Sequence, residues 1–171
     1  WSMKRTIAWV LLVAALLGLA LPAAGQEVVW AREAVDFCVE QGLLDGENLR
    51  LAEPATRAEL ATMLTRLLAL EERASLAAYS DVLPAAWYYD AMAAAVAAGL
   101  LEGEGGTLNP NGDLTREAAM TVLARAFGVA GSDAEALAGF SDSWQLDDWA
   151  VEPVASLVAQ GYVSGSGGQL Q

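Results

Sequence analysis

Histidine is absent from the 171-residue sequence, and cysteine occurs once, at Cys38. Without an imidazole the chain cannot form a Ser-His-Asp triad, a Cys-His dyad or a histidine zinc site. A single cysteine excludes an internal disulfide framework and a multi-cysteine metal site. Cys38 falls on an apolar helical stripe, which predicts a small buried hydrophobe rather than a nucleophile. We therefore expect no metal and no cofactor.

Positive charge is also scarce. Nine Lys and Arg residues face 22 Asp and Glu residues, so the formal net charge is −13. Nucleic-acid binding needs a basic face, and none is expected on this acidic surface. The hydrophobic fraction of 55% is too high for a disordered chain. The length suits one domain or two very small ones.

The amino-terminal 25 residues have the order of a secretory signal peptide. A basic start at Lys4 and Arg5 precedes an unbroken apolar run over residues 7–21, and small residues follow it. We predict a signal peptide over residues 1–25, with Trp1 and Ser2 as a remnant ahead of the natural start. An uncleaved anchor helix is the alternative, although a span needs about 20 apolar residues. Cleavage would remove two basic residues and change the net charge from −13 to −15. Contact with a membrane is expected only during export.

The rest of the sequence repeats with a period of about 60 residues. A tryptophan is followed twelve positions later by a glycine three times, and a Thr-Arg pair follows two of these glycines. An aromatic-Ser-Asp tripeptide precedes two of the tryptophans. The copies are Trp30, Gly42 and Thr56-Arg57; Tyr79-Ser80-Asp81, Trp87, Gly99 and Thr115-Arg116; and Phe140-Ser141-Asp142, Trp149 and Gly161. The chain therefore contains one complete unit between two partial ones, and the units should share a core.

Apolar spacing within each unit predicts two helices. After each tryptophan, apolar residues recur at offsets of five, eight and nine, and the glycine falls where a left-handed C-terminal cap belongs. After each Thr-Arg pair, apolar residues recur at helical offsets for about three turns. A Gly/Asn/Pro loop over residues 103–113 separates the two helices. We expect short strands at the aromatic-Ser-Asp tripeptides, linkers at 71–78 and 128–139, and a late start or a bend at Pro153.

These motifs, in this order and spacing, resemble the S-layer homology (SLH) domain over about residues 28–171. The Asn109-Pro110-Asn111-Gly112 turn and the Thr-Arg-Ala-Glu helix start add to the likeness. The resemblance implies an all-α fold of helical-hairpin repeats packed as a pseudo-threefold bundle, with ligand grooves between repeats. It places repeat 1 at 26–70 with a partial start, a complete repeat 2 at 79–127 and a truncated repeat 3 at 140–171. Two departures matter: the family Glu is replaced by Ala118, and the third Thr-Arg-Ala-Glu segment is missing.

The Thr-Arg pairs are the first candidate site. Thr56 and Glu59 fit a capping box, and Thr115 is the equivalent N-cap. Capping does not explain Arg57 and Arg116, because a cation in the first helical turn opposes the helix dipole. Beside exposed N–H groups, each Arg could bind an anion such as a sugar carboxylate. Alternatively, they pair with Asp81 and Asp142 inside the fold.

Aromatic and acidic residues complete the candidate set. Trp87 and Trp149 could stack on sugar rings or pack in the core, whereas Trp30 fits the core. Trp144 lies in a Ser/Asp-rich loop and could be exposed. Asp81 and Asp142 could accept sugar hydroxyls or bond backbone in their own turn. The turn at residues 109–113 lacks the distal Glu of a calcium loop.

Together these features predict a secreted, non-catalytic module of the cell surface. The SLH resemblance implies anchoring through secondary cell-wall polysaccharide, often pyruvylated, or a peptidoglycan-linked polymer. The site residues expected to contact that ligand are Arg57, Arg116, Trp87, Trp149, Asp81, Asp142, Thr56, Thr115 and Glu59. One alternative is a self-assembling surface subunit, a homo-oligomer whose partial repeats complete one another between chains. Another is a wall-degrading enzyme, for which no pair of acids stands out.

Overall fold

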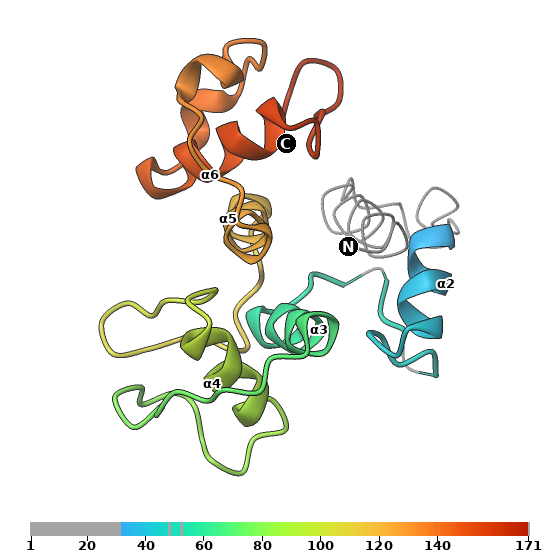
Figure 1. Ribbon diagram of the computed structural model, residues 1–171, viewed down its shortest axis with the longest axis vertical. Coiled ribbons are helices and arrows are strands. Elements are labelled where there is room, and N and C mark those ends of the chain that lie inside the picture. Colours follow the sequence, from blue (N-terminus) through green and yellow to red (C-terminus); the bar gives the residue numbers. More distant parts are fainter. Residues whose placement is uncertain (1–31, 48, 52, 171) are drawn as a thin grey trace. The chain divides into compact units, whose positions relative to one another are not determined.

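The computed structural model describes residues 32–47, 49–51 and 53–170 (Figure 1). Over these residues the chain is all-α, with no β-strand and three isolated β-bridges. The helices are α2 (Arg32–Glu40), α3 (Arg57–Leu68), α4 (Tyr89–Ala97), α5 (Arg116–Phe127) and α6 (Asp148–Ala159), with short 3-10 helices η2 (Ala134–Leu137) and η3 (Ser143–Gln145). The predicted signal peptide and Trp30 lie outside the described residues.

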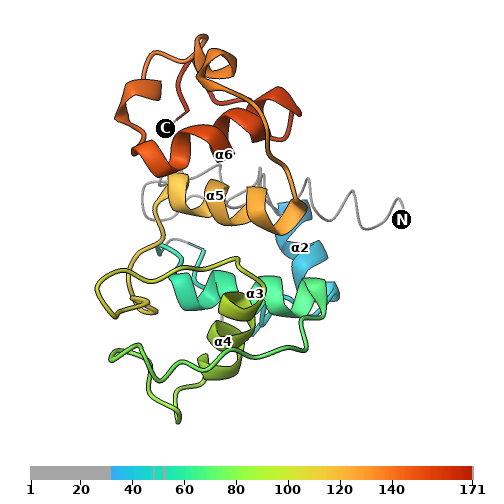
Figure 2. The same ribbon diagram turned by 60° about the vertical axis from the view of Figure 1, so that its left-hand side comes forward.

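The chain divides into two compact units. Among the described residues, the α3–α4 unit comprises those between 39 and 114, and the α5–α6 unit comprises 32–38 together with 115–170. Within the first unit α3 packs against α4 (Figures 1 and 2). Within the second unit α6 packs against both α5 and η2. Each unit thus joins the Thr-Arg helix of one sequence repeat to the tryptophan helix of the next. The sequence predicted the helices, and it did not predict this pairing.

The helix ends agree with the predicted caps. Gly99 follows α4 with φ +68°, and Gly161 follows α6 with φ +74°. This left-handed conformation lets the next N–H groups, those of Leu100 and Tyr162, bond to carbonyls of the last turn at 2.8 and 2.9 Å. At the other end, α6 begins at Asp148 and runs through Pro153, so the expected late start is wrong. A bend at Pro153 stays a prediction.

The predicted apolar stripes form the cores. Leu60 and Leu64 of α3 and Met92 of α4 are fully buried in the α3–α4 unit. Leu123 of α5 and Leu157 of α6 are fully buried in the α5–α6 unit. Fully burying each such side chain stabilises a fold by about 1.5–3 kcal/mol. Cys38 is 1% exposed, as predicted, and burial raises the pKa of its thiol.

The segments predicted as linkers also contribute to the cores. Leu76 is 2% exposed and Leu137 is 3% exposed, at equivalent positions of the two units. The N–H of Ala74 donates to the carbonyl of Ala93 in α4 at 3.0 Å, and residues 134–137 form η2. The sequence did not predict that these two leucines are core residues, because each is a single apolar residue among small and acidic ones and so shows no periodicity.

The aromatic-Ser-Asp tripeptides are turns and not strands, which corrects the sequence expectation. Ser80 and Ser141 each donate one backbone N–H to a loop carbonyl, of Gly106 at 3.0 Å and Gly168 at 2.9 Å, so no ladder forms. The preceding aromatic ring lies against a glycine. A Cβ on Gly103 would come within 2.4 Å of the Tyr79 ring, and one on Gly165 within 2.6 Å of Phe140. In both units, therefore, the second glycine of the Gly-x-x-x-Gly motif leaves room for the aromatic ring.

None of the described helices combines the length and the apolar character that crossing a bilayer would need.

Candidate functional site

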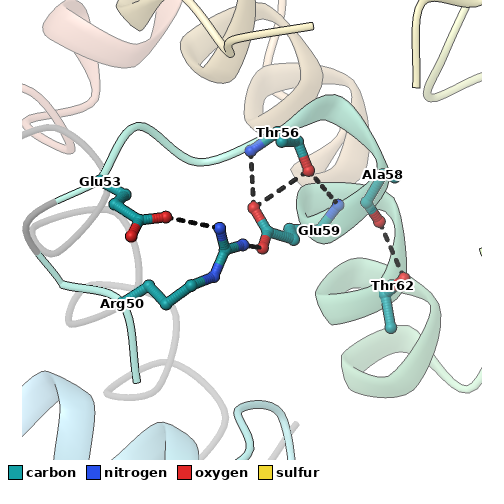
Figure 3. Close-up of polar contacts among 6 residues, drawn as sticks. All are labelled: Arg50, Glu53, Thr56, Ala58, Glu59 and Thr62. Atoms are coloured by element: carbon teal, nitrogen blue, oxygen red, sulfur yellow. Dashed lines mark hydrogen bonds and ion pairs between the residues drawn. The ribbon is translucent and has the colours of Figure 1, made fainter. Parts of the chain in front are cut away.

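The N-terminus of α3 is closed by the predicted capping box (Figure 3). The Thr56 hydroxyl accepts the N–H of Glu59 at 3.2 Å, and the Glu59 carboxylate accepts the N–H of Thr56 at 2.8 Å. The same carboxylate pairs through its other oxygen with Arg50, which also bonds Glu53 at 2.6 Å. These carboxylates raise the pKa of the Arg50 guanidinium. The Arg50 contacts were not predicted from the sequence, because residues 50 and 59 show no pattern that links them.

A loop of the same unit covers the first turn of α3. The N–H groups of Arg57 and Ala58 donate to the carbonyls of Gly112 (3.2 Å) and Pro110 (2.9 Å). The side chain of Arg57 donates from Nε to the carbonyl of Leu108 at 2.8 Å and from Nη2 to that of Glu102 at 3.0 Å. The N–H groups that the sequence analysis expected to be exposed beside Arg57 are therefore already bonded. Arg57 ties this loop to the helix.

Asp81 holds the same loop from the other side. Its carboxylate accepts the N–H of Leu108 at 3.0 Å and that of Asn109 at 2.7 Å. Asp81 and Arg57 thus bind the N–H and the carbonyl of one residue, Leu108. The Ser-Asp pattern predicted a backbone role for Asp81, but within its own turn. The partner lies 27 residues away, which no local pattern reveals.

Trp87 is exposed at the start of α4. Its side chain and backbone together are 67% exposed, whereas the neighbouring Tyr88 is buried. The two rings meet edge to face with centroids 5.3 Å apart. The Tyr88 hydroxyl accepts the side-chain N–H of Asn111 at 3.3 Å, which fixes this segment to the covering loop. Trp87 is thus available as a flat surface, as its predicted stacking role requires.

The N-terminus of α5 has the same Thr N-cap as α3, but the rest of its capping differs. The Thr115 hydroxyl accepts the N–H of Ala118 at 3.2 Å, and Ala118 has no carboxylate to return the bond. Glu117 instead accepts the N–H of Asp147 at 3.1 Å. Within the described residues this helix start therefore has half of a capping box.

Arg116 differs from its counterpart Arg57. Its Nε is buried without a hydrogen-bond partner, and its guanidinium forms no ion pair within 4.0 Å among the described residues. Burial lowers the pKa of Arg116, and the charge of Asp142 acts in the opposite direction. Asp142 also accepts the N–H of Leu170 at 2.8 Å, as Asp81 does for Leu108. Arg116 and Asp142 therefore interact through their charges without forming an ion pair. The Nε donor of Arg116 remains without an acceptor.

Trp149 lies in the first turn of α6 and is 49% exposed. Its indole Nε1 donates to the carboxylate of Asp147 at 3.0 Å, which fixes the ring while leaving part of it accessible. Trp144, in η3, is 79% exposed. Each unit therefore presents exposed tryptophan and, a few residues earlier in the chain, an Asp that holds a loop.

Metal ligation has no support among residues 32–47, 49–51 and 53–170. No three Cys, Asp or Glu side chains of this part of the chain gather as a metal site would require.

Comparison with known proteins identifies the matched region. The S-layer homology domain model matches residues 78–120. The surface-layer 125 kDa protein of Lysinibacillus sphaericus is 37% identical over 141 residues, which is 80% of this chain and 12% of that protein. The S-layer protein sap of Bacillus anthracis is 30% identical over 184 residues, 98% of this chain and 22% of that protein.

Enzymes also carry a similar region. An exoglucanase, XynX of Acetivibrio thermocellus, is 32% identical over 142 residues, 80% of this chain and 13% of the enzyme. The chain thus spans a small part of each of these relatives, and the match to the exoglucanase carries no catalytic role to it. The matched domain and the surface-layer relatives indicate a secreted protein of the cell surface or cell wall. The chain carries an S-layer homology domain, which the family model matches over residues 78–120.

Proposed function

We propose that the chain anchors its carrier to the cell wall by binding an acidic wall polysaccharide. The proposal combines the SLH domain with the names of its relatives, two of which are surface-layer proteins. The ligand class is a polymer with carboxylate-bearing sugars, such as pyruvylated ones. The chain acts as an adhesive module without catalysis.

The observation that carries the proposal is the open donor set of Arg116. A half-buried guanidinium that lacks hydrogen-bond acceptors is unfavourable, because burial removes water without replacing its contacts. A sugar carboxylate would supply a charge-assisted acceptor in the planar geometry that guanidinium groups favour. Thr115 and Asp142 would frame this contact, and Trp149 would offer a ring face to the sugar.

The α3–α4 unit has the equivalent residues, but its arginine already has hydrogen-bond acceptors. Arg57 donates to two loop carbonyls, so a carboxylate here would share a guanidinium that already has acceptors. Thr56 and Glu59 cap the helix, and Asp81 holds the loop. We therefore assign the main acid contact to Arg116 and a supporting one to Arg57 beside Trp87.

Electrostatics place a condition on this binding. An acidic chain of net charge −13 repels an anionic polymer at long range. Salt screens such repulsion beyond about 8 Å at physiological ionic strength. The affinity would therefore come from short-range contacts of the arginines and of the exposed tryptophan rings.

The test is co-sedimentation of the full chain with purified wall polysaccharide, untreated or stripped of its acidic substituents. We expect stronger retention on the untreated polymer than on the stripped one, and a loss of about tenfold in affinity for the untreated polymer in Arg116→Gln. Arg73→Gln is the matched control, since Arg73 is exposed and bonds carbonyls of its own segment. Equal retention on both polymers would refute the acid contact.

A further inference from the structure

Trp144 is the most exposed large apolar residue described, at 79%, and the fold does not use it for packing. The backbone beneath it is nevertheless firmly held. The N–H of Gln145 donates to the carbonyl of Asp142 at 2.9 Å, and the Ser143 hydroxyl donates to the carbonyl of Phe140 at 3.0 Å. A large ring on a fixed turn, left in water, is a feature of binding surfaces more than of ordinary surface positions.

The equivalent position in the other unit sharpens this observation. Asp142 corresponds to Asp81 by the loops they hold, so Trp144 corresponds to Leu83. Leu83 is also strongly exposed, at 68%. Both units therefore present an apolar side chain two residues after the loop-holding Asp, but only one of the two side chains has a flat ring.

The charge of the segment that carries Trp144 restricts what can bind there, and Arg116 faces this segment at Asp142. No Lys or Arg occurs after Arg125, whereas residues 126–171 contain Asp133, Glu135, Asp142, Asp147, Asp148 and Glu152. Phosphates, nucleic acids and anionic lipid surfaces are disfavoured by such a segment. Ser, Asp and Gln side chains flank the ring between residues 141 and 148, and these can exchange hydrogen bonds with hydroxyl groups. The chemistry fits a neutral, hydroxyl-rich ligand with an apolar face, which describes a pyranose ring.

We propose that Trp144, together with Trp149, forms an aromatic subsite for uncharged pyranose rings of the wall polysaccharide. Trp149 is shared with the acid site at Arg116, Trp144 is the added ring, and the proposal rests on the proposed function. Five residues separate the two tryptophans, so their Cα atoms lie within about 18 Å even in a fully extended chain. A polysaccharide segment of about that length can therefore contact both rings.

The experiment measures the affinity of the full chain for untreated and acid-stripped wall polysaccharide by isothermal titration calorimetry. Trp144→Leu installs the residue that the other unit has, and it keeps apolar volume while removing the ring. We expect binding about 3- to 10-fold weaker on both polymers, the range that an aromatic contact provides. Trp144→Phe keeps a flat ring and should stay within about twofold of the wild type on each polymer.

The outcomes separate the two proposals. Unchanged binding of Trp144→Leu, or an equal loss in Trp144→Phe, overturns the aromatic subsite and leaves the Arg116 contact standing. If the affinity depends on the Trp144 ring but is the same for untreated and acid-stripped polymer, the Arg116 contact is overturned and the aromatic subsite stands. Sedimentation velocity at the same concentrations tests a different occupant. A dimer that Trp144→Leu abolishes would assign the ring to a second copy of the chain and overturn the sugar subsite.

Discussion

The helices α3 and α5 begin with the same Thr-Arg pair, yet their first turns differ in how they are completed. At α3 the loop over residues 108–113 accepts two backbone N–H groups, and Arg57 donates to Leu108 and Glu102 in its surroundings. At α5 the Nε of Arg116 stays buried without an acceptor. The same residue type therefore has a structural role in one unit and open donors in the other.

The difference shows that a motif does not fix the role of its arginine. What decides is whether a second segment supplies carbonyls to the first helical turn. In the α3–α4 unit that segment is held by Asp81, and the guanidinium is one of several ties to it. In the α5–α6 unit no carbonyl of the described residues accepts the Nε of Arg116. Assigning function from the Thr-Arg signature alone would treat the two as equal.

The largest expected effect comes from removing the group that holds the covering loop. Asp81→Ala leaves the N–H groups of Leu108 and Asn109 without their carboxylate, and hydrogen bonds to charged groups contribute about 1.5–3 kcal/mol each. Because Asp81 is partly exposed, we expect the free energy of unfolding to fall by about 2–3 kcal/mol in total. Urea unfolding followed by tryptophan fluorescence measures this. A change under about 0.5 kcal/mol would show that the loop holds its place without Asp81.

The second prediction is that Arg57 contributes more than Arg116 to stability, whereas Arg116 contributes more than Arg57 to wall binding. Arg57→Gln removes two charge-assisted bonds to carbonyls and should destabilise the chain by about 1.5–3 kcal/mol. Arg116→Gln removes a poorly solvated charge and should leave stability unchanged or slightly raised, while it weakens wall binding. Paired unfolding and co-sedimentation of both variants provide the measurement. If Arg116→Gln unfolds the chain more readily than Arg57→Gln, its buried Nε has a structural role.

Local features of the fold could be predicted from the sequence. The glycine caps after α4 and α6 and the capping box of Thr56 and Glu59 depend on residues one to four positions apart, so a linear pattern reveals them. Buried stripes with helical spacing were predicted for the same reason.

Contacts between distant segments could not be predicted in this way. Asp81 lies 27 residues before its partner, and Arg57 lies 51 residues before Leu108. Leu76 and Leu137 were missed because one apolar residue among small and acidic ones has no period. The role of each arginine depends on such distant contacts, which is why the sequence left two alternatives open for both.

The third prediction exchanges the capping residues of the two helices. Glu59→Ala gives α3 the residue that α5 has, and losing one half of a capping box should cost about 0.5–2 kcal/mol. Ala118→Glu completes the box at α5 and should stabilise the chain by up to about 1 kcal/mol. The urea midpoint of each variant measures the effect. If Ala118→Glu destabilised the chain as much as Glu59→Ala does, the added carboxylate would not improve the capping of α5. Glu117, which accepts the N–H of Asp147, would then already complete that helix start.

The smallest effect is expected at Arg50, the residue that Figure 3 places beside Glu53 and Glu59. Its side chain is 45% exposed, and exposed ion pairs contribute little because water and salt screen them. The Glu59 oxygen that accepts the Thr56 N–H is not the one that pairs with Arg50. Arg50→Gln should therefore leave the urea midpoint unchanged at both low and high salt. A loss as large as that of Glu59→Ala would show that the ion pair positions the capping carboxylate, and α3 would then depend on a tie that α5 lacks.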